Sequence, residues 1–447
     1  MSVWLPRTTF RATATVVAMG CLACVSGCAG DSEGSSAKKS LPSLSALGNP
    51  DQQVTVTWLD AANTNVNVGS TIKKFEAEYP NITIKYESIP YADFETVLPS
   101  RLTSGKVDVI TVDQPLTARY VAAGYLADIT PVFKSEFDAL DKASLAGSTV
   151  DGKLYNAPEQ SDSSFLFYNK DLLEKAGVAL PSSDPSKPAT WERITADAKK
   201  AQQAGAEHGI TWERISNWYY QWPLVQGLGG GYGADGPDSL TPNLDSEAAV
   251  KAFSWYADLY KDKVSPQGDA NSVYTSLFAS GKSAFHIGGD WNIAELNKNK
   301  DLDYGIAPMP KFAGGQAVSN AGGVGLGLYT GSKNTEAALT FINAMVFKGA
   351  GAAAYNSETS SPPANDEGKK LYWAQEVFQD PRATDAQKVV DHQLSQGIAK
   401  ERVSTVGWNE LSSALSSALL SITNGEDVEK ALKSAQSTAG AALEKYK

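Results

Sequence analysis

Cysteine and histidine are scarce in this chain, and their positions exclude several kinds of chemistry. The 447 residues contain three cysteines and three histidines, at Cys21, Cys24, Cys28, His208, His286 and His392. All the cysteines lie near the N-terminus, so the body of the chain has no disulfide, thiolate metal site or thiol nucleophile. The histidines are scattered and lack the spacing of a metal-ligating motif. We therefore expect no metal site and no catalytic residue of these kinds.

Excess basic charge and long apolar runs are also lacking. The formal net charge is -11 at pH 7, from 39 Lys and Arg against 50 Asp and Glu. Such a chain is poorly suited to bind nucleic acid or an anionic membrane surface. The run Gly231–Gly236 has the letters of a dinucleotide fingerprint but follows no predicted strand, so we expect no cofactor. The length exceeds what one hydrophobic core normally serves and predicts two or more lobes.

The N-terminus carries a predicted targeting segment, residues 1–27. Two arginines precede an apolar run at 12–25 that is too short to span a membrane by itself. The run ends in Val25-Ser26-Gly27-Cys28, which resembles the lipobox of bacterial lipoproteins, and this predicts lipidation of Cys28. A plain secretory signal with an incidental cysteine is the alternative. Residues 28–50 are rich in Ser, Gly, Ala and Lys and predict a flexible tether to the outer face of the plasma membrane.

Apolar strands alternate with helices at the start of the folded body. The predicted strands are 54–59, 82–86 and 107–112, and the predicted helices between them are 69–79 and 93–102. This order predicts a parallel sheet covered by helices on both faces. Ligands bind beyond the carboxyl ends of the strands in such sheets. Those ends carry the candidate ligand-binding residues Asp60, Asn63, Asp113 and Gln114.

A polar run, Glu159–Ser164, directly precedes an apolar strand pattern at 165–167. An ordinary loop is one interpretation. We interpret the surrounding stretch 151–181 as a crossover between two lobes that lines a polar cleft. Farther on, a predicted strand runs into a Gly-Gly turn that presents Asp290 and Trp291. Asp290 either faces a ligand or caps its own turn.

The aromatic side chains are most concentrated between residues 212 and 222. The cluster comprises Trp212, Trp218, Tyr219, Tyr220 and Trp222. Such a cluster forms either a corner of the core or a surface on which a ligand stacks, and individual rings can differ in role. The sequence leaves both interpretations open.

A series of stretches together resembles the extracellular solute-binding lipoproteins of bacterial ABC importers, in their maltose-binding-protein-like sugar-binding branch (solute-binding family 1). The stretches are GYLADITP (124–131), DGKLYNAP (151–158), FLFYNKDLLEKAG (165–177), ATWERI (189–194), QWPLVQGLGGGY (221–232), FASGKSAFHIGGDWNI (278–293), DYGIAPMP (303–310), GGVGLGLYTGSKNTEAALTFI (322–342) and EDVEKALKSAQ (426–436). They cover most of the chain after Cys28 and follow the order of the family.

The resemblance implies an α/β fold of two lobes, the periplasmic-binding-protein fold of the class II type. Each lobe is expected to contain a mostly parallel sheet flanked by helices, with a hinge between the lobes. The implied N-terminal lobe comprises 51–159 and 310–349, and the C-terminal lobe comprises 160–309 and 350–447. The implied crossovers lie near 151–165, 308–312 and 349.

The resemblance also implies further ligand contacts, at Glu95, Asp162, Asn217, Tyr219, Trp291, Arg402 and Trp408. Asp162 stands six residues before the Tyr of the YNK stretch, and Trp291 is the expected stacking ring. The spacing around Arg402 and Trp408 departs from that of maltose-binding protein. An Asp-Arg pair is also missing after the third strand, where Pro115 and Leu116 stand instead, and this puts a maltodextrin specificity in doubt.

The implied function is capture of a mono- or oligosaccharide and delivery to the transmembrane subunits of an ABC permease. Carboxylates accept hydrogen bonds from sugar hydroxyls, and aromatic faces cover the apolar face of a pyranose. One alternative is the same fold with another solute, such as a glycerophosphodiester, a peptide or a compatible solute. A secreted glycoside hydrolase is another, but no motif places the pair of carboxylates that it needs. We expect a monomeric, non-enzymatic binding protein.

Overall fold

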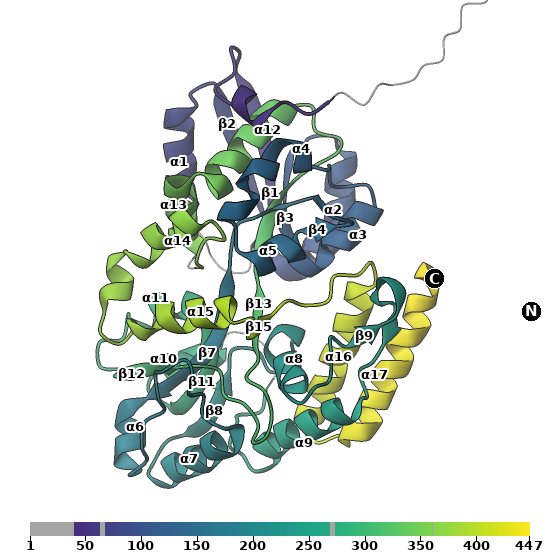
Figure 1. Cartoon of the computed structure of the whole chain (residues 1–447). Coiled ribbons are helices and arrows are strands. Elements are labelled where there is room, and N and C mark those ends of the chain that lie inside the picture. The colour runs from purple at the N-terminus through teal and green to yellow at the C-terminus, as the bar shows by residue number, and fades with distance from the viewer. Residues whose placement is uncertain (1–39, 63–67, 269–272, 360) are drawn as a thin grey trace, which may run out of the picture. The chain divides into compact units, whose positions relative to one another are not determined.

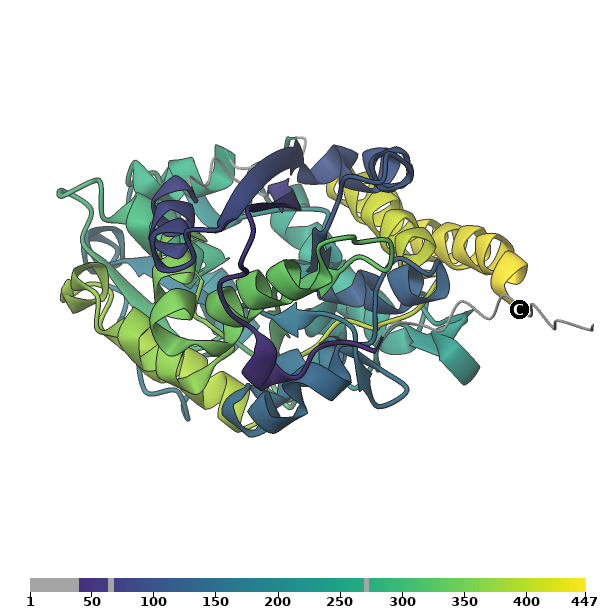
Figure 2. The ribbon, with the colours of Figure 1, turned by 90° about the horizontal axis from the view of Figure 1, so that it is seen from above.

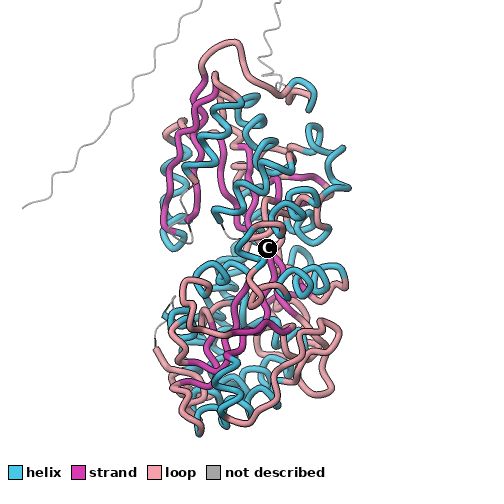
Figure 3. The backbone as a smooth tube through the Cα atoms, turned by 90° about the vertical axis from the view of Figure 1, so that its left-hand side faces the viewer, coloured by secondary structure: helices cyan, strands magenta, loops and turns pink. Residues whose placement is uncertain are grey.

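Two large β-sheets organise the part of the chain that the computed structural model describes, residues 40–62, 68–268, 273–359 and 361–447 (Figure 1). Residues Leu41–Lys447 form one compact unit. Figure 3 shows its strands in two separate groups, and we call the two halves of the unit that surround them the first and the second lobe. The predicted signal, Cys28 and Asn63 lie outside the described residues.

The sheet of the first lobe has five strands. In spatial order they are β2 (Ile82–Pro90), β1 (Val54–Ala62), β3 (Val109–Asp113), β14 (Val324–Leu328) and β6 (Ala157–Pro158). β1 runs parallel to β2 and β3, as the alternation of strands and helices predicts. β14 is antiparallel to both of its neighbours. Every residue of β3 is buried, as expected for a strand with both faces covered.

The sheet of the second lobe is centred on β7. Its strands are β15 (Ala399–Lys400), β13 (Ser319–Gly322), β7 (Asp162–Asn169), β11 (Ser283–Gly289) and β8 (His208–Trp212), with β12 (Tyr304–Ala307) also paired to β7. β7 is antiparallel to β11, β12 and β13. The first lobe therefore has the mostly parallel sheet that was predicted. The sheet of the second lobe is mixed, because β7 enters from the first lobe and runs in the opposite direction to its partners.

Helices cover both sheets. Those associated with the first lobe are α1 (Gly69–Glu78), α2 (Tyr91–Thr103), α3 (Thr117–Ala122), α4 (Thr130–Phe133), α5 (Lys142–Gly147), α12 (Thr335–Ile342) and α13 (Gly349–Thr359). Those associated with the second lobe are α6 (Lys170–Lys175), α7 (Trp191–Gln203), α8 (Trp218–Gly227), α9 (Glu247–Lys261), α10 (Val273–Ala279), α11 (Ile293–Leu296), α14 (Asp366–Trp373), α15 (Asp385–Ser395), α16 (Trp408–Thr423) and α17 (Val428–Leu443). Figure 2 shows α12, in green, lying across the first lobe, where it packs on β1 and β14.

Among the described residues no single helix is long and apolar enough to cross a membrane. One bent pair, Thr335–Phe347 with Gly349–Ser357, meets both criteria only when its two helices are taken together.

The chain passes between the two lobes at three places that lie against one another, and the third is the stretch that leads from α13 to α14, where Pro363 pairs with Gln160. Residues 159–161 join β6 to β7, and Gly323 alone joins β13 to β14. Gly323 has a φ of 153°, and a Cβ atom there would lie 2.8 Å from the Cβ of Gln160 and 2.9 Å from its carbonyl oxygen. The pairing of β13 with β7 puts this second crossing later in the chain than the predicted 308–312. Helix α13, predicted to begin the return to the second lobe, packs on α1 of the first.

The tether predicted through Pro50 is shorter in the structure. Leu41, Leu44 and Leu47 pack against the core of the first lobe. The side-chain amide of Asn81 donates a hydrogen bond of 2.7 Å to the carbonyl of Pro50, and the backbone N–H of Gly48 donates one of 3.1 Å to the hydroxyl of Thr340. The polar composition of this segment concealed the leucine spacing that attaches it to the lobe.

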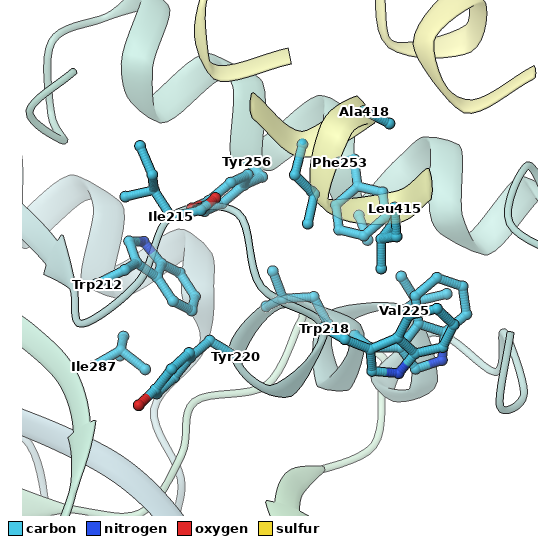
Figure 4. Close-up of a cluster of buried hydrophobic side chains, with 14 of the residues drawn as sticks. Trp212, Ile215, Trp218, Tyr220, Val225, Phe253, Tyr256, Ile287, Leu415 and Ala418 are labelled. Carbon is cyan, nitrogen blue, oxygen red and sulfur yellow. Dashed lines mark hydrogen bonds between the residues drawn. The ribbon is translucent and has the colours of Figure 1, made fainter. Parts of the chain in front are cut away.

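The aromatic cluster is core rather than an open stacking surface (Figure 4). Trp212, Trp218, Tyr220 and Trp222 are all buried. The rings of Trp218 and Trp222 stack at 4.6 Å, and Trp212 packs edge-on against Tyr256 at 5.3 Å. Tyr219 is the member whose side chain points elsewhere, as described below.

We predict that Gly323→Ala lowers the free energy of unfolding by about 1–3 kcal/mol, since the added methyl group would displace the backbone of the neighbouring crossing. The matched control is Gly440→Ala in α17, where the nearest atom to a new Cβ is 3.8 Å away. That variant should be more stable than the wild type by about 0.5–1 kcal/mol. Urea denaturation of both variants checks the pair, and equal effects would contradict the packing of the two crossings.

Candidate functional site

Acidic side chains gather where strands of the two sheets end. They are Asp60 in β1, Asp113 at the end of β3, Glu213 after β8, Asp290 after β11 and Glu401 after β15, with Asp162 at the start of β7. Each is buried or half-buried. The carboxyl ends of strands are where sheet-based proteins bind ligands. The described structure therefore concentrates hydrogen-bond acceptors along this region.

Asp162 lies at the centre of this group. The hydroxyl of Tyr219 donates a hydrogen bond of 2.7 Å to its carboxylate. Burial raises the pKa of Asp162 to about 7, against the lowering effects of Tyr219 and Arg402. Asp113 and Glu213 raise it further, which places both acids within electrostatic reach. Asp162 thus couples the strand ends of both sheets.

An ion pair joins the two sheets next to Asp162. The guanidinium of Arg402, which follows β15, donates to both carboxylate oxygens of Asp113 at 2.9 and 2.5 Å. The same guanidinium lies 5.3 Å from the ring of Tyr219 and 5.8 Å from that of Trp408. A buried bidentate pair of this kind constrains both partners in orientation as well as distance. Asp113, Asp162, Tyr219 and Arg402, all predicted separately, therefore form one contact network.

Trp291 is held beside this network by Glu213. The indole N–H donates a hydrogen bond of 2.6 Å to the Glu213 carboxylate, and the indole ring lies 6.1 Å from that of Tyr219. Burial raises the pKa of Glu213, and the Trp291 hydrogen bond opposes that rise. The half-buried Trp291 ring is fixed at its edge, which leaves its face as the part suited to stacking. Asn217 accepts from the backbone N–H of Tyr219 at 2.9 Å, so it caps α8 and positions that tyrosine.

Asp290 is 1% exposed, and no described group donates a hydrogen bond of ordinary geometry to either carboxylate oxygen. It does not cap its turn, since the side chain of Asn292 accepts the backbone N–H of Gly289 at 3.1 Å. Burial raises the pKa of Asp290 well above its usual range, and the charge of Asp162 raises it further. A ligand hydroxyl is the kind of donor that such a group lacks.

Four of the remaining predicted residues have their own partners away from Asp162. Asp60 accepts from the hydroxyls of Tyr86 and Thr111, each at 2.7 Å. Burial raises the pKa of Asp60, and both burial and Asp60 raise the pKa of Glu159. Gln114 donates to the carbonyl of Ser144 at 3.3 Å, and Glu95 accepts from Tyr120 and from Asn409. Trp408 is 5% exposed and packs edge-on against Trp218 at 5.2 Å, so its ring face is not open for stacking in this conformation.

Sequence reasoning missed several residues of the site. They are Glu213, Glu401 and Tyr372. Glu213 and Glu401 each directly follow a strand, and the rule that selected Asp60 and Asp113 would have found them had β8 and β15 been recognised. Burial raises the pKa of Glu401 to about 8. A hydrogen bond from Tyr372 lowers the pKa of Asp290, and no sequence pattern indicates that these two residues meet.

The acids do not form a coordination sphere. Within the described ranges, no group of three or more His, Cys, Asp or Glu side chains could hold a metal ion. The carboxylates around Asp162 are separated by the tyrosine, tryptophan and arginine side chains that bind them. The arrangement instead offers acceptors and ring faces, which suits a ligand rich in hydroxyl groups.

Comparison with known proteins gives a consistent result. Residues 62–352 match the family described as bacterial extracellular solute-binding protein. The galactooligosaccharide-binding protein of Bacillus subtilis (strain 168) is 28% identical over 399 residues, which are 86% of this chain and 88% of that protein. A maltooligosaccharide ABC transporter solute-binding lipoprotein of Streptococcus pneumoniae (strain ATCC BAA-255 / R6) is 29% identical over 231 residues, 50% of this chain and 52% of that one.

A solved structure shares the fold. The GacH receptor of Streptomyces glaucescens aligns with a TM-score of 0.75 at 24% identity and covers 89% of this chain and 100% of that one. The alignment extends across both sheets described above. It confirms the predicted two-lobed α/β fold of the periplasmic binding proteins.

We predict that the buried Asp162 makes stability depend on pH with a defined sign. Its pKa of about 7 exceeds the ordinary value near 4, so between these values the native state binds a proton that the unfolded chain does not. The contribution is fully present below about pH 4 and is lost as the pH rises through about 7. The wild type should therefore lose stability relative to Asp162→Asn over this window, as measured by urea denaturation.

The matched control for this measurement is Glu174→Gln, which removes an exposed carboxyl group on α6. Its stability difference from the wild type should stay nearly constant over the same pH range. A difference between the wild type and Asp162→Asn that is also constant would contradict the raised pKa.

Proposed function

The chain belongs to the family of bacterial extracellular solute-binding proteins, and from this premise we propose that it captures a mono- or oligosaccharide between its lobes for an ABC importer. The observation that carries the proposal is the network around Asp162. It combines buried carboxylates with two aromatic rings, those of Tyr219 and Trp291, and the pair of Arg402 with Asp113 connects it to the first sheet. A ligand held there would contact both lobes at once.

The chemistry of the network favours a sugar. The buried carboxyl group of Asp290 has no well-aligned donor among the described residues apart from the influence of Tyr372, and hydroxyl groups of a ligand can supply further hydrogen bonds. An acceptor that stays buried without a donor costs about 1–3 kcal/mol, so a hydroxyl-bearing ligand gains affinity by relieving that cost. The face of Trp291 can cover the apolar face of a pyranose. The concentration of acids repels a phosphodiester, which arginine clusters would bind better.

The relatives agree with this choice of ligand class. One is named for galactooligosaccharides and another for maltooligosaccharides and an ABC transporter. We propose that the ligand of this chain is a sugar of this general kind and that the closed protein delivers it, as a monomer, to the transmembrane subunits of a permease. Two-lobed proteins close because the ligand contacts both lobes better in the closed form.

We propose further that the sugar is bound and not hydrolysed. A glycosidase needs an acid and a second carboxylate free to act on one glycosidic bond. Here Asp162 is engaged by Tyr219, Glu213 by Trp291 and Asp113 by Arg402. Such pairings suit the positioning of a ligand rather than proton transfer and nucleophilic attack.

The N-terminal sequence supports attachment of the protein to the cell surface. Cys28 follows the small residues Ser26 and Gly27 and a short apolar run. We propose that the chain is cut before Cys28, lipidated there and held on the outer face of the plasma membrane. The folded unit that the structure describes begins at Leu41.

We predict that residues 29–447 bind one sugar class selectively and that Trp291→Ala and Asp162→Asn each weaken binding about 5- to 150-fold, the equivalent of about 1–3 kcal/mol. Isothermal calorimetry against mono-, di- and oligosaccharides, a glycerophosphodiester and a peptide measures this. The control Glu174→Gln should bind as the wild type does. Binding of the phosphodiester or peptide alone would overturn the sugar assignment, and release of smaller sugars during incubation would overturn the absence of turnover.

We predict that Cys28→Ala abolishes incorporation of labelled fatty acid when the full chain is expressed in bacteria. Cys24→Ala is the matched control, since Cys24 lies within the apolar run, and it should remain labelled. Fractionation should place the control with membranes and Cys28→Ala away from them or unprocessed. Labelling that persists in Cys28→Ala would contradict the assignment.

A further inference from the structure

A second polar network joins the lobes outside the proposed ligand site. We infer that this Arg119 clasp, which consists of Glu95, Arg119, Asn409, Glu410 and Tyr446, holds the lobes closed and slows ligand release. Its members are positioning residues and not ligand contacts. The inference rests on the proposed function in that it assumes that closure accompanies binding.

Arg119, in α3 of the first lobe, reaches into the C-terminal part of the second lobe. Its guanidinium donates hydrogen bonds of 2.8 Å to the hydroxyl of Tyr446 and 3.2 Å to the carbonyl of Val406. It also lies 3.7 Å from the carboxylate of Glu410. One arginine of the first lobe thereby contacts three groups of the second.

The second-lobe side of the clasp is itself organised. The Tyr446 hydroxyl donates to Glu410 at 2.9 Å, and Lys445 donates to the same carboxylate oxygen at 2.7 Å. Glu410 stands in the first turn of α16, and its side chain is 13% exposed. The receiving site for Arg119 is thus formed by contacts within the second lobe.

Glu95 completes the clasp from the first lobe. It accepts from Tyr120 of its own lobe and, at 3.1 Å, from the side-chain amide of Asn409 of the other. Its carboxylate lies 3.7 Å from Arg119, which holds the guanidinium between two acids. The sequence predicted Glu95 as a ligand contact, and these partners indicate a different role.

The clasp lies away from the crossings that act as a hinge. Figure 1 shows α16 and α17 to one side of β7 and β13, with α3 above them, and Figure 2 shows the yellow C-terminal helices next to blue helices of the first lobe. A contact far from a hinge is lost early when the lobes separate. Arg119 would then exchange its protein partners for water. The clasp therefore favours the closed form by the difference in free energy between its contacts with the second lobe and its contacts with water.

The Arg119 clasp also differs in kind from the Arg402 pair. Arg402 contacts Tyr219 and Asp113, which belong to the proposed ligand site. Among the described residues, no member of the clasp forms a hydrogen bond or ring contact with Asp162, Tyr219 or Trp291. Substitutions in the clasp can therefore change closure while the ligand contacts stay as they are.

The test uses Arg119→Gln and Tyr446→Phe in residues 29–447. Because this segment contains no cysteine, a pair introduced at the exposed Ser135 and Lys251, one in each lobe, can carry spin labels without background. Pulsed dipolar spectroscopy then measures the interlobe distance without any ligand. The matched control is Arg101→Gln, which breaks an ion pair with Glu87 inside the first lobe.

We expect both clasp variants to shift the ligand-free distance distribution toward longer distances, whereas Arg101→Gln keeps that of the wild type. With the sugar found by calorimetry, the dissociation rate of the clasp variants should rise roughly 5- to 30-fold at a nearly unchanged association rate. Wild-type distance distributions in both clasp variants would overturn the inference. That outcome is separate from the ligand class, because the distance measurement needs no ligand, and melting curves identify a variant that fails to fold.

Discussion

The structure depends on the three adjacent places where the backbone crosses between the lobes, the third being the return from α13 to α14 beside Gln160. Residues 159–161 and Gly323 lie against each other so closely that no side chain fits at Gly323. These adjacent crossings form a short axis about which the lobes can turn. At this axis β7 begins and β13 ends. Both lie next to the ends of β3 and β14, so the strand ends of the two sheets meet there. The site exists because the crossings bring those ends together.

Burial of acids is the energetic consequence of this geometry. Asp162, Asp290, Glu213 and Glu401 all have raised pKa values, with desolvation as the largest cause in each case. A buried charge is tolerated when it is paired, and Arg402 supplies one such pairing with Asp113. The remaining acids are stabilised by tyrosine and tryptophan donors or by holding a proton. A ligand that donates hydrogen bonds would supply the rest, which couples binding to the electrostatics of the closed protein.

Several features of the fold followed from local patterns. The alternation at 54–59, 82–86 and 107–112 predicted the parallel strands β1, β2 and β3, because burial on both faces produces continuous apolar runs. Asp113 was placed correctly at the end of a strand, whereas Asp162, expected in the polar run before a strand, is the first residue of β7. The structure joins the two through Arg402 and Tyr219. The mixed second sheet was not predicted, since antiparallel pairing of β7 with β11, β12 and β13 involves partners that lie more than a hundred residues away. The attachment of Leu41–Leu47 to the first lobe was missed because its composition is that of a linker.

The sequence by itself determined the family, the two-lobed class and the residue types available for binding, because these depend on short motifs and local periodicity. Only the tertiary structure decided which of those residues act together. It separated Glu95 and Trp408 from the group around Asp162. It assigned Trp212, Trp218 and Trp222 to the core. It also brought Glu213 to the indole of Trp291. The physical reason is that hydrogen bonds and desolvation act over a few ångströms in space, and the chain positions that meet at such distances are set by the crossings and not by sequence spacing.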